Sequence, residues 1–274
     1  MARVLILSSY VASSRVGGGA QALALARLGI EPILVPTVLF GRHPGHGPPG
    51  GGAVDAEIFE AMIGGVEAQG HFARSDAVIT GYFSSPEQVA IAADTLSRVK
   101  AAAPQARLIV DPIMGDDGGG LYVKEAVAEA IASLLVPRAD VVAPNAWELG
   151  RLTGCAVADP ASAVAAARTL GKPVMVSSIR AGGEIGVVYA DDRDAWFASH
   201  PAVTAAPHGT GDLLTALFAA ALLGGFAAPD ALALAVSGVA DAVSEAAGFD
   251  ELLLAGFPVS LAASPRVSLA PVHG

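Results

Sequence analysis

Residues 77–110 read AVITGYFSSPEQVAIAADTLSRVKAAAPQARLIV, and this stretch decides the fold. It opens on an apolar run, Ala77–Thr80, continues through a helical segment, Pro86–Ala101, and closes on a second apolar run, Arg107–Val110. Ser85 stands before the first-turn proline, which is an arrangement typical of helix starts. A strand, a helix and a second strand of these lengths predict a βαβ unit with parallel strands.

The same alternation extends in both directions along the chain. Further strands are expected at 3–7, 32–35, 141–143 and 174–177, and further helices at 20–28, 55–69, 124–135 and 160–170. Two later runs, 185–190 and 195–199, predict a hairpin that is followed by helices at 212–223 and 229–247. We therefore expect an α/β protein with one open, mostly parallel sheet, helices on both faces and a hairpin in the C-terminal half. No repeat or linker divides the chain, so residues 1–274 are expected to form one domain.

Composition narrows the class of protein. The 274 residues carry 16 basic and 26 acidic side chains, a net charge of −10, and no Lys/Arg cluster, so a nucleic-acid partner is not expected. The single cysteine, Cys155, excludes an internal disulfide and a cysteine-based zinc site. The apolar stretches are too interrupted to span a membrane, and the first residues lack a signal-peptide pattern. We expect a soluble, cytoplasmic protein.

The strongest chemical feature is the turn Gly209-Thr210-Gly211-Asp212, which opens directly into a long apolar helix. Glycines let successive backbone N–H groups converge, and the helix adds the positive end of its dipole, so the turn suits a phosphoryl group. Asp212 falls on the first helical turn, where its carboxylate can accept the proton of an attacking hydroxyl. A glycine turn with an acidic N-cap is the competing explanation.

Acidic and amide side chains follow two predicted strands. Asp111 and Asp116 stand in the segment DPIMGD, and Asn145 and Glu148 stand in the segment PNAWE. Because ligands of open α/β sheets bind beyond the carboxyl ends of the strands, these side chains are placed for a complex of Mg²⁺ and a nucleotide. The competing explanations are a turn started by Asp-Pro and a capping box formed by Asn145 and Glu148.

Other motifs give weaker or negative signals. Gly17-Gly18-Gly19 opens a helix, but contiguous glycines do not match the G-x-G-x-x-G dinucleotide fingerprint. The sequence also lacks a G-x-x-x-x-G-K-[ST] loop and a G-x-S-x-G elbow. The histidines at 43, 46, 71, 200 and 208 show no metal-ligand spacing, and most are expected at the surface.

In chain order, the segments DPIMGD, APNAWE and GTGDLL resemble the motifs of the pyridoxal kinases of the ribokinase superfamily. Ser9, Thr37, His43 and the segment TGY at 80–82 agree with the N-terminal part of that pattern, so the resemblance covers essentially the whole chain. It implies a three-layer α/β/α, ribokinase-like fold. It also implies ATP-dependent phosphorylation of the 5′-hydroxyl of pyridoxal, pyridoxine or pyridoxamine, with Mg²⁺ and K⁺ as candidate cations, and a homodimer.

The resemblance further implies roles for individual residues. Asp212 is the base, and the anion hole consists of Gly209, Thr210 and Gly211. The residues assigned to the nucleotide are Asp111, Asp116, Tyr122, Ala143, Asn145, Glu148, Ser177, His200, Pro201, Ala202 and Val203, with Asp116 and Glu148 as metal ligands. The residues assigned to the vitamer pocket are Ser9, Thr37, His43, Pro44, Gly45, Tyr82 and Asp212.

The chain departs from that family in the segment 41–53. Where the family usually has a polar, aromatic-bearing lid, this sequence reads PGHGPPGGG after His43, and we expect a surface loop that acts as a lid. The missing aromatic leaves two alternatives open. One is a kinase for a hydroxymethylpyrimidine-type alcohol, although that branch usually carries Cys where Asp212 stands. The other is a non-catalytic protein that binds a B6 vitamer.

Overall fold

A ten-stranded sheet forms the middle layer of the computed structural model, which describes residues 1–203, 206–256 and 259–273. In spatial order its strands are β12 (Ser268–Pro271), β11 (Ala195–Pro201), β10 (Glu184–Ala190), β9 (Val174–Ala181), β8 (Val141–Val142), β5 (Arg107–Val110), β4 (Ala77–Thr80), β1 (Arg3–Val11), β2 (Glu31–Phe40) and β3 (Gly51–Ala53). The strands from β9 to β2 are parallel, and those beyond them at each edge are antiparallel. The expected mostly parallel sheet and the hairpin, β10 with β11, are confirmed.

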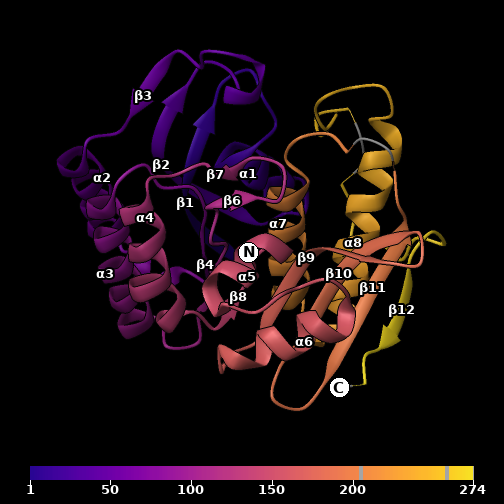
Figure 1. Ribbon diagram of the computed structural model, residues 1–274. Helices are drawn as coiled ribbons and strands as arrows, with labels where there is room; N and C mark the ends of the chain where they lie inside the picture. Colours follow the sequence, from indigo (N-terminus) through magenta and orange to yellow (C-terminus); the bar gives the residue numbers. More distant parts are fainter. Residues whose placement is uncertain (204–205, 257–258, 274) are drawn as a thin grey trace.

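Helices cover both faces of the sheet (Figure 1). One face carries α2 (Ala56–Ala68), α3 (Pro86–Ala102), α4 (Glu125–Ala130), α5 (Ala146–Thr153) and α6 (Pro160–Thr169). The other face carries α1 (Gly17–Arg27), α7 (Thr210–Leu223) and α8 (Ala228–Glu245). The three-layer α/β/α arrangement is therefore confirmed.

Alternate residues of the parallel strands fill the two cores. Ile6 and Ile79 pack toward α1, α7 and α8, whereas Leu5 and Val78 pack toward α2, α3 and α4, and all four are fully buried. Successive side chains of a strand point to opposite faces, so a strand covered on both faces is apolar at every position. That is why these strands stand out as short continuous apolar runs in the sequence.

The segment 41–53 differs from the expected irregular loop. It contains a short 3-10 helix, η1 (Pro44–His46), and then β3, which pairs antiparallel with β2 so that Ala53 lies opposite Val38. β2 is also longer than expected and ends only at Phe40. The physical reason is that backbone pairing along a sheet edge needs no particular side chain, so a glycine-rich strand leaves no apolar pattern.

Three smaller differences concern the middle of the chain. A two-stranded sheet, β6 (Gly115–Asp116) with β7 (Gly120–Leu121), holds the segment after β5 and was not expected. The helix expected at 124–135 is α4 followed by a π-helical turn, η3 (Ile131–Leu135), and a 3-10 turn, η4 (Val136–Arg138). A further 3-10 turn, η2 (Phe72–Arg74), precedes β4.

Within the described part of the chain, no helix combines the length and the apolar character needed to cross a membrane.

The sheet topology locates the ligand-binding edge. From β1 the chain first adds β2 on one side and later β4 on the other, so the strand order reverses at β1. Ligands of open α/β sheets bind at such a reversal, beyond the carboxyl ends of the strands. Ser9 near the end of β1, Gly81 after β4 and Asp111 after β5 all lie at this edge.

Candidate active site

Asp212 lies in the first turn of α7, and its carboxylate turns toward α1. Its Oδ2 accepts the backbone N–H of Gly17 at 2.7 Å, whereas its Oδ1 is buried and accepts no hydrogen bond. Burial raises the pKa of Asp212 to about 6, although the Gly17 N–H acts to lower it. Leaving a buried oxygen without a hydrogen bond costs free energy. Because Oδ1 has no existing bond to give up, it is free to accept the proton of a hydroxyl group that binds beside it.

The backbone before Asp212 requires glycine. Gly209 has φ +90°, and a Cβ there would collide with the carbonyl oxygen of Arg15. Gly209 is the N-cap of α7, and no side chain caps that helix, so the first-turn N–H groups of Thr210 and Gly211 carry the positive end of the dipole without a capping partner. The structure therefore contradicts the explanation of Asp212 as an acidic N-cap and supports an anion-binding turn.

Gly17 is a site residue that the sequence motifs did not identify. It has φ +60°, and a Cβ there would collide with Oγ of Ser9, while a Cβ on Gly18 would collide with the Leu34 side chain. The N-terminus of α1 thus packs directly on the end of β1 and delivers its N–H to Asp212. The contiguous glycines were the only available signal, and their purpose depends on a contact between residues 195 positions apart.

Asp111 joins α7 to the acidic part of the site. Its carboxyl is buried, and the hydroxyl of Thr215 in α7 donates to its Oδ2 at 2.8 Å. Burial raises the pKa of Asp111 well above its usual range, and the charges of Glu148 and Asp212 raise it further. Asp111, Glu148 and Asp212 therefore form one electrostatic cluster, which we call the carboxylate cluster.

Glu148 and Asn145 form the capping box of α5. Glu148 Oε2 accepts the Asn145 N–H at 2.8 Å, and Asn145 Oδ1 accepts the Glu148 N–H at 2.9 Å. Glu148 Oε1 also accepts the N–H groups of Met114 and Gly115 at 2.8 and 3.3 Å, and Asn145 Nδ2 donates to Gly115 at 2.8 Å. Burial raises the pKa of Glu148 to about 7, against the effect of these N–H groups. The capping explanation is confirmed, and the same bonds fix the segment after β5 to α5.

Asp116 is held within its own turn between β6 and β7. Its Oδ1 accepts the N–H groups of Gly118 and Gly119 at 3.0 and 2.6 Å, and its Oδ2 accepts the hydroxyl of Tyr122. Burial acts to raise the pKa of Asp116, but these hydrogen bonds outweigh it, and the net shift is downward. Asp116 and Tyr122 are thus brought together, as an ionised carboxylate beside a half-exposed phenol.

The other residues assigned to the nucleotide fall into two groups. Ala143 follows β8, and Ser177 in β9 forms an isolated bridge with Asn145 and donates its N–H to Pro144 at 3.0 Å. These residues adjoin the capping box. The segment His200–Val203 ends β11 and continues beyond it, separated from β8 by β9 and β10.

The residues assigned to the vitamer ring lie around the end of β1 and β2. Ser9 is buried, and Thr37 is fully buried, with its hydroxyl donating to the carbonyl of Tyr82 at 2.6 Å. The Gln88 side chain donates to the carbonyls of Thr37 and Val54 at 2.9 and 2.7 Å. The Thr37 hydroxyl therefore ties β2 to the segment after β4, which accounts for this residue without a ligand.

His43, Pro44 and Gly45 lie on the segment 41–53 beside the turn Gly209–Asp212, which we call the catalytic turn. The N–H of His43 donates to Oγ of Ser14 at 3.3 Å, and the His43 ring stacks near that of His208. The segment thus reaches the residue immediately before Gly209. His43 and His208 are brought together by the fold, a relation that their spacing in the sequence does not reveal.

The donor set bears on whether the site fits Mg²⁺. Among residues 1–203, 206–256 and 259–273, no three His, Cys, Asp or Glu side chains are placed to hold a metal ion together. Both oxygens of Glu148 already accept backbone N–H groups. The buried carboxyls repel one another, so a cation beside them would be stabilising. Few of their oxygens are free to contact it directly. The site therefore fits a Mg²⁺ ion that keeps several of its waters and also contacts phosphates, as this ion usually does in proteins.

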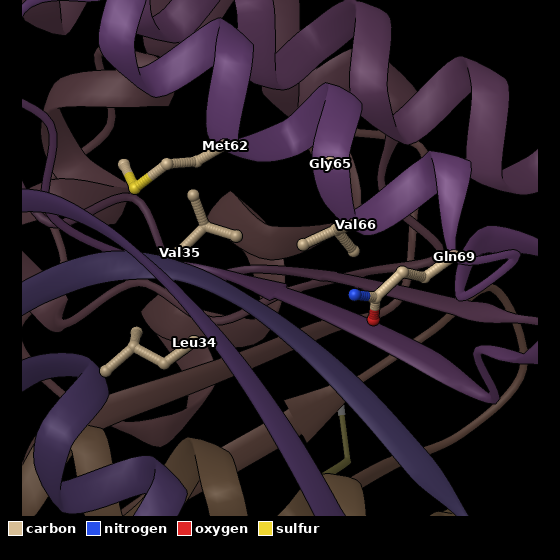
Figure 2. Close-up of a pocket in the computed structure, with 6 residues that line it drawn as sticks. All are labelled: Leu34, Val35, Met62, Gly65, Val66 and Gln69. Carbon is tan, nitrogen blue, oxygen red and sulfur yellow. The ribbon is translucent and has the colours of Figure 1, made fainter.

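An apolar pocket of about 320 Å³ lies elsewhere, between β2 and α2 (Figure 2). Its lining consists of Leu34, Val35, Met62, Gly65, Val66 and Gln69. None of these six side chains is titratable, so this pocket offers no acid, base or nucleophile. The carboxylate cluster lies instead at the carboxyl ends of the strands.

Comparison with known proteins gives a consistent set of relatives. A family model described as phosphomethylpyrimidine kinase matches residues 53–253. A pyridoxine/pyridoxal/pyridoxamine kinase of Bordetella avium is 38% identical over 230 residues, which are 81% of this chain and 78% of the relative. A pyridoxal kinase of Corynebacterium diphtheriae is 34% identical over 248 residues, which are 88% of each chain.

Solved structures of pyridoxal kinases are similar to this chain over essentially its whole length. A pyridoxal kinase from Entamoeba histolytica matches with a TM-score of 0.92 and 25% identity, over 99% of this chain and 100% of that one. A pyridoxal kinase from Leishmania donovani in complex with ADP and pyridoxamine matches with a TM-score of 0.89 and 27% identity, over 100% of both chains.

Proposed function

We propose that this chain, which belongs to the pyridoxal kinases of the ribokinase superfamily, transfers the γ-phosphoryl group of ATP to the 5′-hydroxyl of pyridoxal, pyridoxine or pyridoxamine. The observation that carries this proposal is the position of Asp212. One of its oxygens is held by Gly17 and the other is buried and free, at the uncapped N-terminus of α7. A base beside an anion-binding turn is what transfer of a phosphoryl group to an alcohol requires.

Asp212 acts as the general base. Its free Oδ1 accepts the proton of the vitamer hydroxyl, while the bond from Gly17 to Oδ2 keeps the carboxylate in one orientation. A pKa of about 6 leaves most of the carboxylate ionised at neutral pH and brings its basicity close to the working pH. The N–H groups of Gly209, Thr210 and Gly211 stabilise negative charge on the phosphoryl group during transfer.

The nucleotide half of the site uses the strand ends from β5 to β11. We propose that the phosphates lie near Asn145, Tyr122 and Ser177, and that the adenine side is bounded by Ala143 and the segment His200–Val203. Their positions beyond the carboxyl ends of the strands support this assignment.

We propose that Mg²⁺ is held through water by Asp116 and Glu148, close to Asp111. When bound, Mg²⁺ neutralises charge on the phosphate oxygens and relieves the repulsion among the buried carboxyls. K⁺ is a further candidate cation at the nucleotide phosphates.

The vitamer half of the site lies under the segment 41–53. We propose that Ser9 contacts the pyridine ring, and that the rest of the pocket is formed by Thr37, His43, Pro44, Gly45 and Tyr82. The burial of Ser9 at the end of β1 and the reach of His43 to the catalytic turn support this placement. Residues 44–52 contain no Phe, Tyr or Trp, so we assign His43 and Tyr82 as the planar side chains beside the pyridine ring.

A substrate panel tests the proposed function. The purified protein is incubated with ATP and Mg²⁺ and with pyridoxal, pyridoxine, pyridoxamine or a hydroxymethylpyrimidine, and ADP and the phosphorylated product are measured. We expect ADP formation that depends on a B6 vitamer and yields its 5′-phosphate in equal amount. ADP formation with the pyrimidine alone would refute the assignment.

The pyrimidine alcohol is the second candidate because the matching family model carries that description. Asp212 speaks against it, since the pyrimidine branch usually has Cys at this position. Retention of a vitamer without turnover of ATP would instead indicate a binding protein, but the intact pairing of Asp212 with Gly17 supports catalysis.

Three general assignments complete the proposal. The continuous sheet from β3 to β12 supports one kinase domain over residues 1–274. Leu39 and Ile58, which are exposed by 50% and 55%, give β2 and α2 an apolar surface that supports a homodimer. The use of ATP supports a cytoplasmic location. Light scattering of the purified protein tests the dimer.

A further inference from the structure

Three histidines from two distant parts of the chain face one another beside the catalytic turn. We call His43, His46 and His208 the histidine cluster. The ring centroids of His43 and His208 are 4.4 Å apart with planes tilted by 33°. His46 meets His208 at 5.5 Å and His43 at 5.8 Å, in both cases edge to face. These are the separations at which aromatic rings attract one another.

His208 is fixed to the catalytic turn. It immediately precedes Gly209, its N–H donates to the Asp250 carbonyl at 2.9 Å, and its backbone forms a parallel bridge with Glu251. Gly209 packs against the Arg15 carbonyl, which holds the turn from the other side. The backbone of His208 is therefore anchored, and its ring is the surface that His43 and His46 of the segment 41–53 contact.

His46 makes a second link between the same two parts of the molecule. Its Nδ1 lies 3.8 Å from Oε1 of Glu251, and Oε2 of Glu251 accepts the N–H of Arg15 at 3.2 Å. The carboxylate thus connects the segment 41–53 to the residues that pack on the catalytic turn. His43 has a different set of contacts, so the two histidines of this segment are not equivalent.

His43 is built into the cluster in its neutral form. Its Nδ1 accepts the N–H of Gly45 at 3.1 Å, which places its proton on Nε2. Burial lowers the pKa of His43, and His208 and His46 lower it further, whereas Glu251 acts to raise it. A Cβ on Gly45 would lie 2.9 Å from Nδ1 of His43 and 3.5 Å from Nε2 of His208, so glycine permits this close packing.

We propose that His46 and His208 are positioning residues that hold the segment 41–53 closed on the catalytic turn and keep His43 in place over the vitamer. The proposal rests on the proposed function, because it takes the B6 vitamer as the ligand beneath His43. The closing force is ring packing between residues of the segment and a residue of the turn. Loss of either ring opens the segment and weakens vitamer binding before it affects the transfer step.

Limited digestion with trypsin tests the closure without any need for activity. Arg42 lies within the segment, is exposed, and donates its Nε to the Pro48 carbonyl at 2.8 Å, so cleavage after it reports opening. We expect His46→Ala and His208→Ala each to speed the appearance of the fragment that begins at His43 by about 2- to 10-fold, the scale of one aromatic contact. The double variant should do little more than either single one, because the rings act together. His273→Ala, far along the chain and exposed, is the matched control.

Steady-state kinetics tests the link to the vitamer. His46→Ala and His208→Ala should raise the KM for the vitamer by about 2- to 10-fold with little change in kcat, and His46→Phe should restore most of it by replacing the ring. Unchanged cleavage at Arg42 in both alanine variants overturns the closure. Faster cleavage with an unchanged KM overturns the role in vitamer binding. A wild-type protein that phosphorylates no vitamer refutes the proposed function and leaves the digestion test intact.

Discussion

Replacement of Asp212 by Asn should remove catalysis and stabilise the protein at the same time. Asn cannot accept the proton of the substrate hydroxyl, so kcat should fall by roughly 10² to 10⁴. ADP should still bind, because the assigned nucleotide residues stay in place. The amide has nearly the same shape as the carboxyl and retains an oxygen for the Gly17 N–H, so the fold should be preserved.

The gain in stability follows from the raised pKa of Asp212. The carboxyl has an ordinary pKa of 3.8 and a folded-state pKa of about 6, so the folded protein binds the proton more tightly than the unfolded chain. Wild type therefore loses stability as the pH rises from about 4 to about 6 and bears the full cost above that, about 3 kcal/mol for two pKa units. This figure already includes the Gly17 hydrogen bond, because the pKa of about 6 is the net result of burial and of that bond.

Urea denaturation of the ligand-free proteins measures this difference. At pH 8 the Asn variant should be more stable by about 1–3 kcal/mol, equivalent to about 2–6 °C in Tm. At pH 4 the two proteins should be nearly equal, because Asp212 is then protonated in the folded wild type. A variant that keeps its kcat, or that is less stable than wild type at pH 8, would refute the reasoning.

Three further changes test other parts of the site. If Asp212 must be ionised, kcat/KM should fall about tenfold per unit below pH 6, and a profile that is flat to pH 5 would contradict its role as base. Gly209→Ala should lose turnover and lower Tm because of the positive φ and the collision with the neighbouring backbone, whereas Gly211→Ala, which meets nothing within 4 Å, should keep the Tm of wild type. Thr215→Val should lower the free energy of unfolding by about 1–3 kcal/mol, because Asp111 loses its hydrogen bond, and Thr215→Ser should retain most of it; equal stability of the two would count against that bond.

The strands and helices that build the three layers could be predicted from the sequence, because each depends on a pattern of residues close together in the chain. Strands buried on both faces are apolar at each position. Two helices with a first-turn proline are preceded by a capping side chain, Ser85 for α3 and Asp159 for α6. These patterns predicted the βαβ units and the hairpin β10–β11. The sequence did not predict β3, because this strand pairs with β2 through backbone hydrogen bonds alone. Such pairing requires no apolar or β-branched side chain at Gly51 or Gly52, so the sequence carries no strand pattern there.

In the candidate site, too, the residues themselves could be predicted from the sequence, whereas the contacts between them could not. Asp111, Glu148 and Asp212 were identifiable because each follows a strand or a glycine turn in a recognisable motif. Their electrostatic coupling was not, because it depends on distances across the sheet edge. Asn145 and Glu148 show that a local explanation and a site assignment can both apply, since the capping box also carries the segment around Gly115.

By itself, the sequence determined the βαβ alternation, the glycine turn before Asp212 and the family to which they belong, because each depends on residues close together in the chain. Only the tertiary structure decided that Gly17 donates to Asp212, 195 positions away, and that Thr215 donates to Asp111, 104 positions away. It also decided that His46 and His208 meet beside the catalytic turn. The reason is physical: packing α1 and α7 on one face of the sheet brings their N-termini to the same strand ends, and no local pattern encodes that encounter.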